Sequence, residues 1–224
     1  MQNPNAIAAV IFDMDGVLCD SEPYITEAAI RWFKERRNIH VQREEFLPFT
    51  GAGEARFVGG VAEKHGVPFD PQTDTHQVYE IYLQIIKGRL HPMAGLKQFL
   101  TLCQAQRLPL AIATSADPIK MTGNLREICL PASTFNIMVT GTDVVHRKPD
   151  PDIYLLAVQR LGLPAETCLV IEDAINGVLA AKAAGCRCLG LTTSFDAEHL
   201  RDAGADWIAK DFTAVPSLIF KDNM

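Results

Sequence analysis

Five short segments rich in apolar and β-forming residues recur along the chain, and they constrain its fold more than any other feature. Several of them are apolar throughout rather than alternating with polar residues, which is typical of strands buried on both faces of a parallel sheet. The segments are Ala6–Phe12, Leu108–Thr114, Asn136–Thr140, Cys168–Glu172 and Cys188–Thr192. The pattern predicts a parallel sheet with helices packed against both of its faces.

Segments with helical character lie between the expected strands, and two of them begin with a start signal. Asp117-Pro118 precedes the segment Ile119–Leu130. Asp150-Pro151 likewise precedes Ile153–Leu161. In each pair, Asp can accept hydrogen bonds from the unpaired N–H groups of the first turn, and Pro suits the first helical position. The alternation of strand and helix predicts an α/β chain with a doubly wound, Rossmann-like parallel sheet.

One stretch interrupts this alternation. From about Ser21 to Leu90 there is no convincing strand, and three helix-like segments are joined by loops that contain Gly and Pro. The three segments are Glu22–Arg37, Glu54–His65 and Thr75–Lys87. We therefore expect an α/β core formed by residues 1–20 and 91–224, and a small helical domain of residues 21–90 inserted after the first strand.

Composition narrows the classes of function. The 224 residues include 21 Lys and Arg against 27 Asp and Glu. The sequence contains no block of basic residues that would favour nucleic acid as the main partner. No apolar run approaches the ~18 residues of a membrane span, and no basic residue precedes Arg31, so we expect neither a membrane anchor nor a secretory leader. The six cysteines form no CxxC pair and are expected to be reduced thiols. We expect a cytoplasmic monomer.

Two acidic residues, Asp13 and Asp15, directly follow the first expected strand within Phe12–Leu18. Residues two apart in an extended chain project to the same side, and two carboxylates so close repel each other unless a cation lies nearby. Ligands bind at the carboxyl edge of such sheets, where one Asp can attack an electrophile while the other transfers a proton. The alternative is an acidic turn without chemistry. This alternative is less favoured because a strand precedes the pair and a helical insert follows it.

Three further groups of polar residues are expected at the same edge of the sheet. Thr114 and Ser115 end the second strand, where a hydroxyl and free backbone N–H groups can hold a phosphoryl oxygen. Lys148 precedes a helix start and can offset the charge of a nucleophile and a phosphate. Glu172 and Asp173 end the fourth strand. Taken singly, each group is also explained as a helix cap or a solvated side chain. Together, the acids require a hard divalent cation, and Mg²⁺ fits their oxygen ligands.

These four motifs, in this order and over nearly the whole chain, resemble those of the haloacid dehalogenase superfamily, especially its phosphatases and β-phosphoglucomutase-like proteins with a small helical cap. The resemblance implies that Asp13 is the nucleophile and that Asp15 is the general acid and base. It also implies that Thr114 positions the phosphoryl group and that Lys148 neutralises charge.

The same resemblance implies how a metal ion is bound. Mg²⁺ would be held by the side chains of Asp13 and Asp173 and by the backbone carbonyl of Asp15, with Glu172 either in contact with the ion or behind its ligands. The cap segment Phe49–Phe57 and the run Ala113–Asp117 are also similar to the phosphatase-like domain of plant suppressor-of-quenching proteins.

Caps in this superfamily cover the site, and their loops choose the substrate. The resemblance therefore places Gly51, Glu54 and Arg56 of the insert near the substrate, with Glu54 or Arg56 against the leaving group. Ser115 and Ala116 are the expected substrate contacts in the core. The alternative is that the glycines only form a turn and that Glu54 caps the next helix.

The function expected from the resemblance is hydrolysis of a small phosphorylated metabolite, such as a sugar phosphate, through an aspartyl-phosphate. The main alternative is a β-phosphoglucomutase-like phosphotransferase. Those mutases have a His on the first cap helix and a Lys shortly after the second motif. The matching positions here are Ile25 and the stretch Ala116-Asp117-Pro118, where the acid would repel a second phosphate.

Three other classes are less favoured. A dehalogenase does not use a second Asp two residues after the first, so Asp15 argues against it. A receiver-type signalling domain has no 70-residue insert after its first strand. A non-catalytic binding module would be expected to have lost catalytic residues, and none is lost here.

Overall fold

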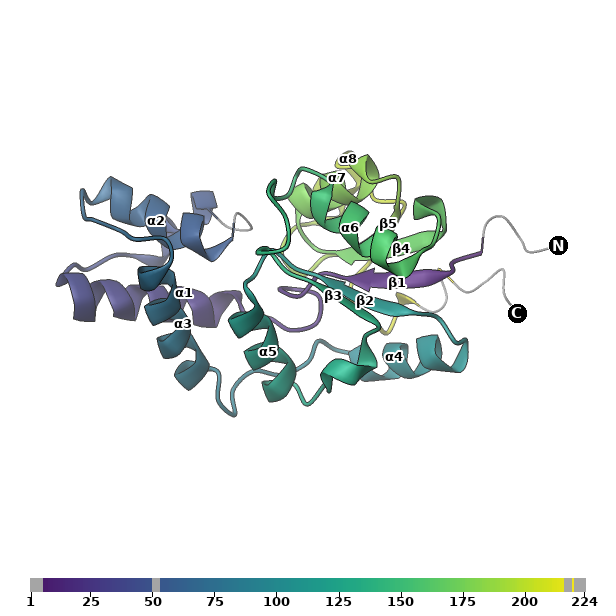
Figure 1. Ribbon diagram of the computed structural model, residues 1–224, viewed down its shortest axis with the longest axis horizontal. Helices are drawn as coiled ribbons and strands as arrows, with labels where there is room; N and C mark the ends of the chain where they lie inside the picture. Colours follow the sequence, from purple (N-terminus) through teal and green to yellow (C-terminus); the bar gives the residue numbers. More distant parts are fainter. Residues whose placement is uncertain (1–5, 50–52, 216–218, 220–224) are drawn as a thin grey trace.

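The sheet is the central element of the structure, a computed structural model that describes residues 6–49, 53–215 and 219 (Figure 1). Its six strands are all parallel and have the order β3-β2-β1-β4-β5-β6. The strands are β1 Ala9–Phe12, β2 Leu110–Ala113, β3 Ile137–Val139, β4 Cys168–Glu172, β5 Arg187–Leu191 and β6 Trp207–Ala209. The winding reverses between β1 and β4, which confirms the doubly wound α/β sheet and puts the point of reversal beside Asp13.

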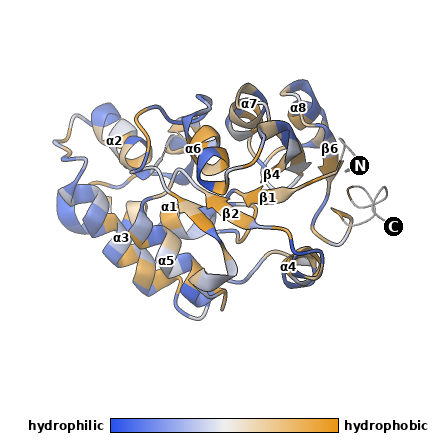
Figure 2. Ribbon diagram, turned by 45° about the vertical axis from the view of Figure 1, so that its right-hand side comes forward, coloured by the Kyte–Doolittle hydropathy of each residue, from blue (hydrophilic) through white to orange (hydrophobic). Residues whose placement is uncertain are grey.

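Both faces of the sheet are buried, as the continuous apolar segments predict. Val10 and Phe12 pack into one hydrophobic core, and Ala9 and Ile11 pack into the other. Figure 2 shows the central strands in the colours of apolar residues and the covering helices with mixed surfaces. Helices α4 (Leu96–Ala105) and α5 (Pro118–Glu127) cover one face; α6 (Asp152–Leu161), α7 (Ile175–Ala183) and α8 (Ala197–Asp202) cover the other (Figure 1).

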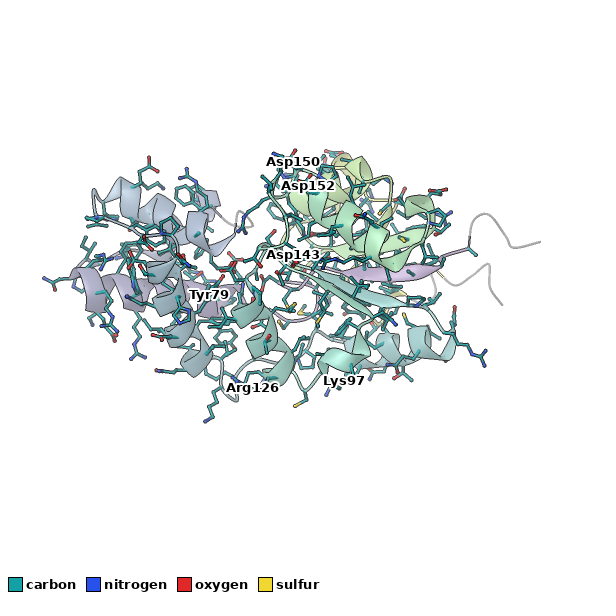
Figure 3. All side chains as sticks on the ribbon, viewed as in Figure 1. Tyr79, Lys97, Arg126, Asp143, Asp150 and Asp152 are labelled. Carbon is teal, nitrogen blue, oxygen red and sulfur yellow. The ribbon has the colours of Figure 1, made fainter. Side chains whose placement is uncertain are left out.

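The expected capping by Asp at two helix starts is wrong. Pro151, not Asp150, occupies the N-cap position of α6, and Figure 3 shows Asp150 at the outer edge of the core. Asp117 does occupy the N-cap position of α5, but its side chain makes no capping hydrogen bond. Burial and the nearby charge of Glu54 raise the pKa of Asp117, because its carboxylate lies toward the helical insert.

The inserted helices lie beyond the carboxyl ends of the strands, at the left of Figure 1, and we call residues 22–85 the cap. The cap helices are α1 Glu22–Trp32, which continues as a π-helical turn over Phe33–Arg37, α2 Glu54–Lys64 and α3 Thr73–Ile85. Buried side chains of all three helices, among them Trp32, Val58 and Tyr79, form the interior of the cap. The expected domain limits at residues 20/21 and 90/91 stay a prediction.

The two connections between cap and core run next to each other. The N–H of Met93 donates to the carbonyl of Leu18 at 3.0 Å, and Cys19 pairs with Pro92 in an antiparallel bridge. The chain therefore leaves the core and returns to it at one place, directly after Asp13 and Asp15.

All six cysteines are free, as expected. The described residues contain no helix that could cross a membrane. The cytoplasmic location and the monomeric state stay predictions.

Candidate active site

Asp13 lies where β1 ends, and neighbouring strands fix its position. Its backbone N–H continues the pairing with β4 by donating to the carbonyl of Ile171 at 3.0 Å. Its carboxylate is buried and accepts a hydrogen bond from Nζ of Lys148 at 2.6 Å. The predicted nucleophile and the predicted charge-neutralising lysine are thus in direct contact, although 135 positions separate them in the sequence.

Lys148 is held between two carboxylates. Its Nζ also donates to Oε1 of Glu172 at 2.6 Å and to the carbonyl of Ala113 at 3.3 Å. Burial alone would lower the pKa of Lys148, but the charges of Asp13 and Glu172 outweigh it and raise the pKa. The lysine therefore carries a fixed positive charge beside the nucleophile.

Glu172 is held by the turn that joins β4 to α7. Its Oε1 accepts from the Tyr154 hydroxyl at 2.8 Å as well as from Lys148, and its Oε2 accepts from the N–H groups of Asp173 (2.9 Å) and Ala174 (3.1 Å). A Cβ at Gly177 would lie 1.8 Å from Oε1, so only glycine leaves room for this carboxylate. With both oxygens already bonded, Glu172 is suited to orient Lys148; its predicted contact with a metal ion stays a prediction.

Asp173 completes a buried acidic cluster. One carboxylate oxygen from each of Asp13, Glu172 and Asp173 can be chosen so that the three atoms lie within 4.8 Å of one another. Asp173 accepts hydrogen bonds from the hydroxyls of Thr193 and Ser194. The described residues show no ion pair to it.

The charges of this cluster are not balanced by the described residues alone. Burial raises the pKa of Asp13 to about 7, even though Lys148 opposes the shift. Burial, and then the charges of Glu172 and Asp13, also raise the pKa of Asp173. Three buried carboxylates with one lysine are therefore short of positive charge, and a hard divalent cation would supply what they lack. The donor set fits the predicted Mg²⁺; the share of the Asp15 carbonyl stays a prediction.

Thr114 lies at the end of β2, beside Asp13, and is fully buried. Its hydroxyl oxygen accepts from the N–H of Ala116 at 3.1 Å, which shapes the turn after the strand. Nη1 of Arg147 donates to the carbonyl of Ser115 at 2.7 Å and fixes the same turn from the other side. The turn thus holds the predicted phosphate-binding residues at the edge where Asp13 ends β1.

Lys120 is the functional residue that the sequence argument missed. This side chain on α5 is 2% exposed, and its Nζ lies 2.7 Å from Oδ2 of Asp15 and 2.7 Å from Oε1 of Glu54. The hydroxyl of Tyr79, on the side of the cap toward the core (Figure 3), donates to the other oxygen of Glu54 at 3.0 Å. Lys120 thus joins the predicted acid and base to the cap.

A signal for Lys120 is present in the sequence. Lys120 and Asn124 are four residues apart, so they lie on one face of α5, and both are buried together with Met121 and Leu125. A lysine on the apolar face of a helix needs a buried partner. The stretch Ala116-Asp117-Pro118, which matches the position of the mutase lysine, ends two residues before Lys120.

A small cavity of about 40 Å³ lies between cap and core at this point. The described residues that line it are Asp15, Glu22, Ile25, Gly53, Glu54, Phe57, Ser115, Ala116 and Lys120. The structure therefore brings Glu54, Ser115 and Ala116 together beside Asp15, as the resemblance implies. This space is suited to the leaving group of a substrate.

Two other predicted substrate contacts are not among the lining residues. The guanidinium of Arg56 is ion-paired with Glu63 at 3.2 Å and lies over the ring of Phe49. Its contact with substrate stays a prediction. Gly51 lies outside the described residues.

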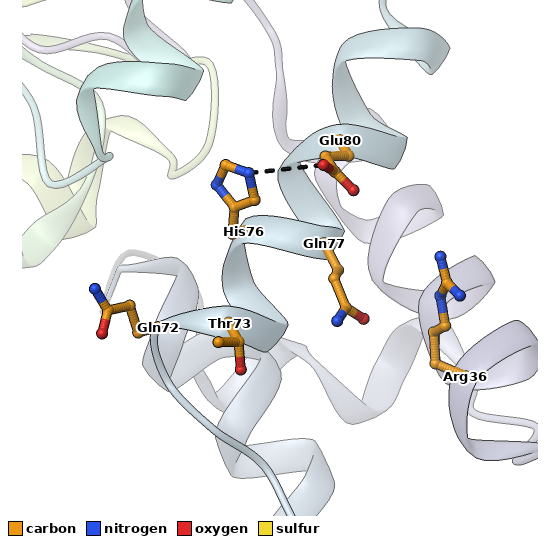
Figure 4. A pocket seen from close by; sticks show the side chains of 6 residues that line it. All are labelled: Arg36, Gln72, Thr73, His76, Gln77 and Glu80. Carbon is orange, nitrogen blue, oxygen red and sulfur yellow. Dashed lines mark ion pairs between the residues drawn. The ribbon is translucent and has the colours of Figure 1, made fainter.

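A larger hollow of about 730 Å³ lies on the outer side of the cap (Figure 4). It is lined by Arg36, Gln72, Thr73, His76, Gln77 and Glu80, with His76 and Glu80 3.6 Å apart. It is wide open, and none of the predicted catalytic residues lines it. The smaller cavity is lined by Asp15, Ser115 and Ala116 and is therefore the candidate site for substrate.

Comparison with known proteins decides the family. Residues 7–185 match the family model of haloacid dehalogenase-like hydrolases. The chain belongs to this family. The haloacid dehalogenase-like fold is shared with the crystal structure of CbbY from Rhodobacter sphaeroides in complex with phosphate. That structure has a TM-score of 0.83 and 27% identity over 93% of this chain and 96% of that chain.

Two relatives of the family are similar over most of this chain. Protein SUPPRESSOR OF QUENCHING 1, chloroplastic, from Arabidopsis thaliana is 40% identical over 92% of the chain, which spans only 20% of that protein's length. Phosphorylated carbohydrates phosphatase from Thermotoga maritima is 35% identical over 90% of this chain and 94% of its own. Both the superfamily and the similarity to suppressor-of-quenching proteins, expected from the motifs, are confirmed.

Proposed function

We propose that this protein is a Mg²⁺-dependent phosphatase that hydrolyses a small phosphate monoester, such as a sugar phosphate, through an aspartyl-phosphate. The observation that carries the proposal is the buried cluster in which Lys148 bonds to both Asp13 and Glu172, with Asp173 beside them. The relative from Thermotoga maritima, which spans nearly the same length and whose name is that of a phosphatase of phosphorylated carbohydrates, supports the substrate class.

The first half of the reaction transfers the phosphoryl group to the enzyme. A carboxylate oxygen of Asp13 forms a bond to phosphorus while the bond from phosphorus to the leaving oxygen breaks. Asp15 donates a proton to that leaving oxygen, and Lys148 stabilises the charge of the phosphoryl oxygens. The turn after Thr114 orients the group with its backbone N–H groups. Mg²⁺, held by Asp13 and Asp173, supplies further neutralisation of the phosphoryl charge.

The second half returns the enzyme to its starting state. Asp15, now a carboxylate, takes a proton from water, whose oxygen forms a bond to phosphorus as the bond to Asp13 breaks. Inorganic phosphate leaves, and Asp15 again holds the proton. In the structure Asp15 is bonded to Ser21 and Lys120, so the leaving group must take the place of one of these partners.

A phosphotransferase is the second candidate, and Lys120 is the observation that favours it. A lysine shortly after the second motif is present after all, and it reaches the cavity. Its charge is already shared by Asp15 and Glu54, however, and Ile25, which lines the same cavity, has no proton to share. We therefore favour water as the acceptor.

Two assays test the proposal. A panel of phosphate esters is incubated with Mg²⁺, and release of inorganic phosphate is measured. β-Glucose 1-phosphate is then supplied with a catalytic amount of glucose 1,6-bisphosphate, and glucose 6-phosphate and free phosphate are followed separately. Phosphate release without isomerisation is expected. Fast isomerisation with little phosphate release would overturn the hydrolase assignment in favour of the mutase.

A further inference from the structure

The cavity between cap and core has an unusual balance of charge for a site that receives a phosphorylated compound. Among the described residues that line it, Asp15, Glu22 and Glu54 are acidic and Lys120 alone is basic. Asp117, at the start of α5, adds another carboxylate near Glu54, and Arg147, whose guanidinium lies against Gly53, adds a second positive charge. The part of the site where a leaving group lies is therefore acidic overall.

The positive charge of Lys120 is not available to an incoming anion. Its Nζ is bonded to both Asp15 and Glu54 at 2.7 Å. An anionic group could bind Lys120 only by displacing one of these carboxylates. The carboxylate of Glu54 is buried, and that of Asp15 is partly buried. A carboxylate left buried without its cation is strongly unfavourable. Hydroxyl or ammonium groups, in contrast, can donate to the same carboxylates without displacing the lysine.

The cap must move for any such group to enter. The cavity of about 40 Å³ holds little more than one water molecule, whose share of the liquid is about 30 Å³. Glu54 belongs to the cap, whereas Lys120 and Asp15 belong to the core. In the arrangement of the structure Glu54 lies against Lys120, so a leaving group bound here must be compatible with both of these charges.

We propose that Glu54 and Lys120 select the substrate by the charge of its leaving group: phosphate monoesters with an uncharged polyhydroxylated or a cationic leaving group are accepted, and those with a second phosphate or a carboxylate are rejected. The inference rests on the proposed function and specifies its substrate class. It assigns a selectivity role to Lys120, which belongs to none of the four motifs.

A matched series of ligands tests the proposal. Glucose 6-phosphate, glucosamine 6-phosphate and 6-phosphogluconate have the same carbon skeleton and differ in whether the distal part is neutral, cationic or anionic. Their inhibition constants are measured against hydrolysis of p-nitrophenyl phosphate, and their own kcat/KM values are measured by phosphate release. The neutral and cationic compounds are expected to bind and react at least about tenfold better than 6-phosphogluconate, because its carboxylate would be placed against like charges in a buried site.

Variants assign the selectivity to named residues. Glu54→Gln frees part of the charge of Lys120, and the ratio of kcat/KM for 6-phosphogluconate to that for glucose 6-phosphate is expected to rise about tenfold. Lys120→Gln should lower the same ratio. The control is Glu80→Gln, which removes an exposed carboxylate of the cap outside this cavity and should leave the ratio unchanged.

The outcomes separate this proposal from the proposed function. If 6-phosphogluconate binds and reacts as well as glucose 6-phosphate in the unmodified protein, the proposed selection by charge is overturned, whereas the proposed phosphatase function is retained. A ratio that does not change in Glu54→Gln likewise overturns the role of Glu54. If no ester is hydrolysed with Mg²⁺, the proposed function fails. Calorimetric binding of the three compounds to the same protein then still decides whether the site discriminates by charge.

Discussion

Two buried lysines, Lys148 and Lys120, are each bonded to two carboxylates, but only one of them depends on the cap. The partners of Lys148, Asp13 and Glu172, both belong to the core. Lys120 shares its charge between Asp15 in the core and Glu54 in the cap. The charge beside the nucleophile is therefore constant, whereas the surroundings of the acid and base change with the position of the cap.

The nucleophile gives the sharpest prediction at the scale of single residues. Asp13→Asn keeps the shape of the side chain but removes one carboxylate of the acidic cluster and, with it, the charged oxygen that attacks phosphorus in the proposed mechanism. Turnover is expected to fall by roughly 10³-fold or more, measured as phosphate release from the best ester of the panel. Asp150→Asn, at an exposed position, is the control and should keep full activity. Near-normal turnover by folded Asp13→Asn protein would refute the mechanism.

Asp15 should affect proton transfer in both halves of the proposed reaction. Asp15→Asn cannot donate a proton to the leaving oxygen or take one from water, so both halves of the reaction slow while Asp13 can still be phosphorylated by an ester with a good leaving group. We expect phosphorylated enzyme to accumulate with p-nitrophenyl phosphate, detected by intact-protein mass spectrometry after an acid quench. The same experiment on Asp13→Asn, where the acceptor carboxylate is missing, should show no phosphorylated protein.

Among the elements, the start of α7 determines the geometry of the site most directly. The two N–H groups that hold Glu172 come from the turn before this helix, and Gly177 leaves the space that the carboxylate occupies. Alanine at this position would normally favour a helix by about 1 kcal/mol. Here its Cβ would meet Oε1 of Glu172 at 1.8 Å, so the element cannot accept it without moving the carboxylate that orients Lys148.

Gly177→Ala is therefore expected to lower kcat by about tenfold or more and the free energy of unfolding by about 1–3 kcal/mol, a typical result of overpacking. Steady-state kinetics and urea denaturation measure the two effects. Gly59→Ala, on cap helix α2, is the matched control, because the atoms nearest to its Cβ belong to the ring of Phe69, at 3.0 Å, and to no residue of the acidic cluster. That variant should keep its activity. Equal kinetics for the two variants would show that Gly177 is not needed for the position of Glu172.

The elements also show how far a sequence of this kind can be interpreted. Five strands were predicted because continuous apolar segments have few alternatives in an α/β chain, and the motifs at their ends meet because parallel strands share an edge. Strand β6, Trp207–Ala209, was missed because it has only three residues and is flanked by polar ones. A segment this short shows neither a continuous apolar run nor an alternation of apolar and polar residues. Helix α4 was also missed; its amphipathic pattern lies directly after the insert.

Contacts between cap and core were beyond the sequence argument. The pairing of Lys120 with Glu54 joins residues 66 positions apart, and no local pattern specifies which cap residue meets which core residue. The same holds for Asp117, whose place at a helix start predicts a cap, although its carboxylate lies toward Glu54. Tertiary packing therefore determined the partner of Lys120, and it overrode the local capping rule only at Asp117.

At the scale of the whole molecule, the acidic cluster makes stability depend on metal and pH together. In the metal-free protein the pKa of Asp13 is raised from 3.8 to about 7. The folded state thus binds a proton that the unfolded chain has lost, so this stabilising contribution is complete below about pH 4 and disappears as the pH rises to about 7. Asp173 shifts in the same direction. Mg²⁺ bound as proposed would hold the deprotonated carboxylates and should compensate at high pH.

We therefore expect the increase in Tm caused by Mg²⁺, relative to EDTA, to be larger at about pH 8 than at about pH 5. Differential scanning fluorimetry in matched buffers measures it. Asp173→Asn should lose most of the increase at pH 8, and Asp150→Asn should keep it. An increase of equal size at both pH values would show that these carboxylates are not the metal ligands.

The side-by-side connections between cap and core have a consequence for the evolution of such a protein. Because the chain leaves and re-enters the core where Leu18 meets Met93, the intervening segment can be lengthened, shortened or exchanged without altering the path of the sheet. Under the proposed function, the cap and the substrate preference it sets could change while the residues at the edge of the sheet stay the same. A recombination event at this junction could therefore exchange the substrate and keep the chemistry.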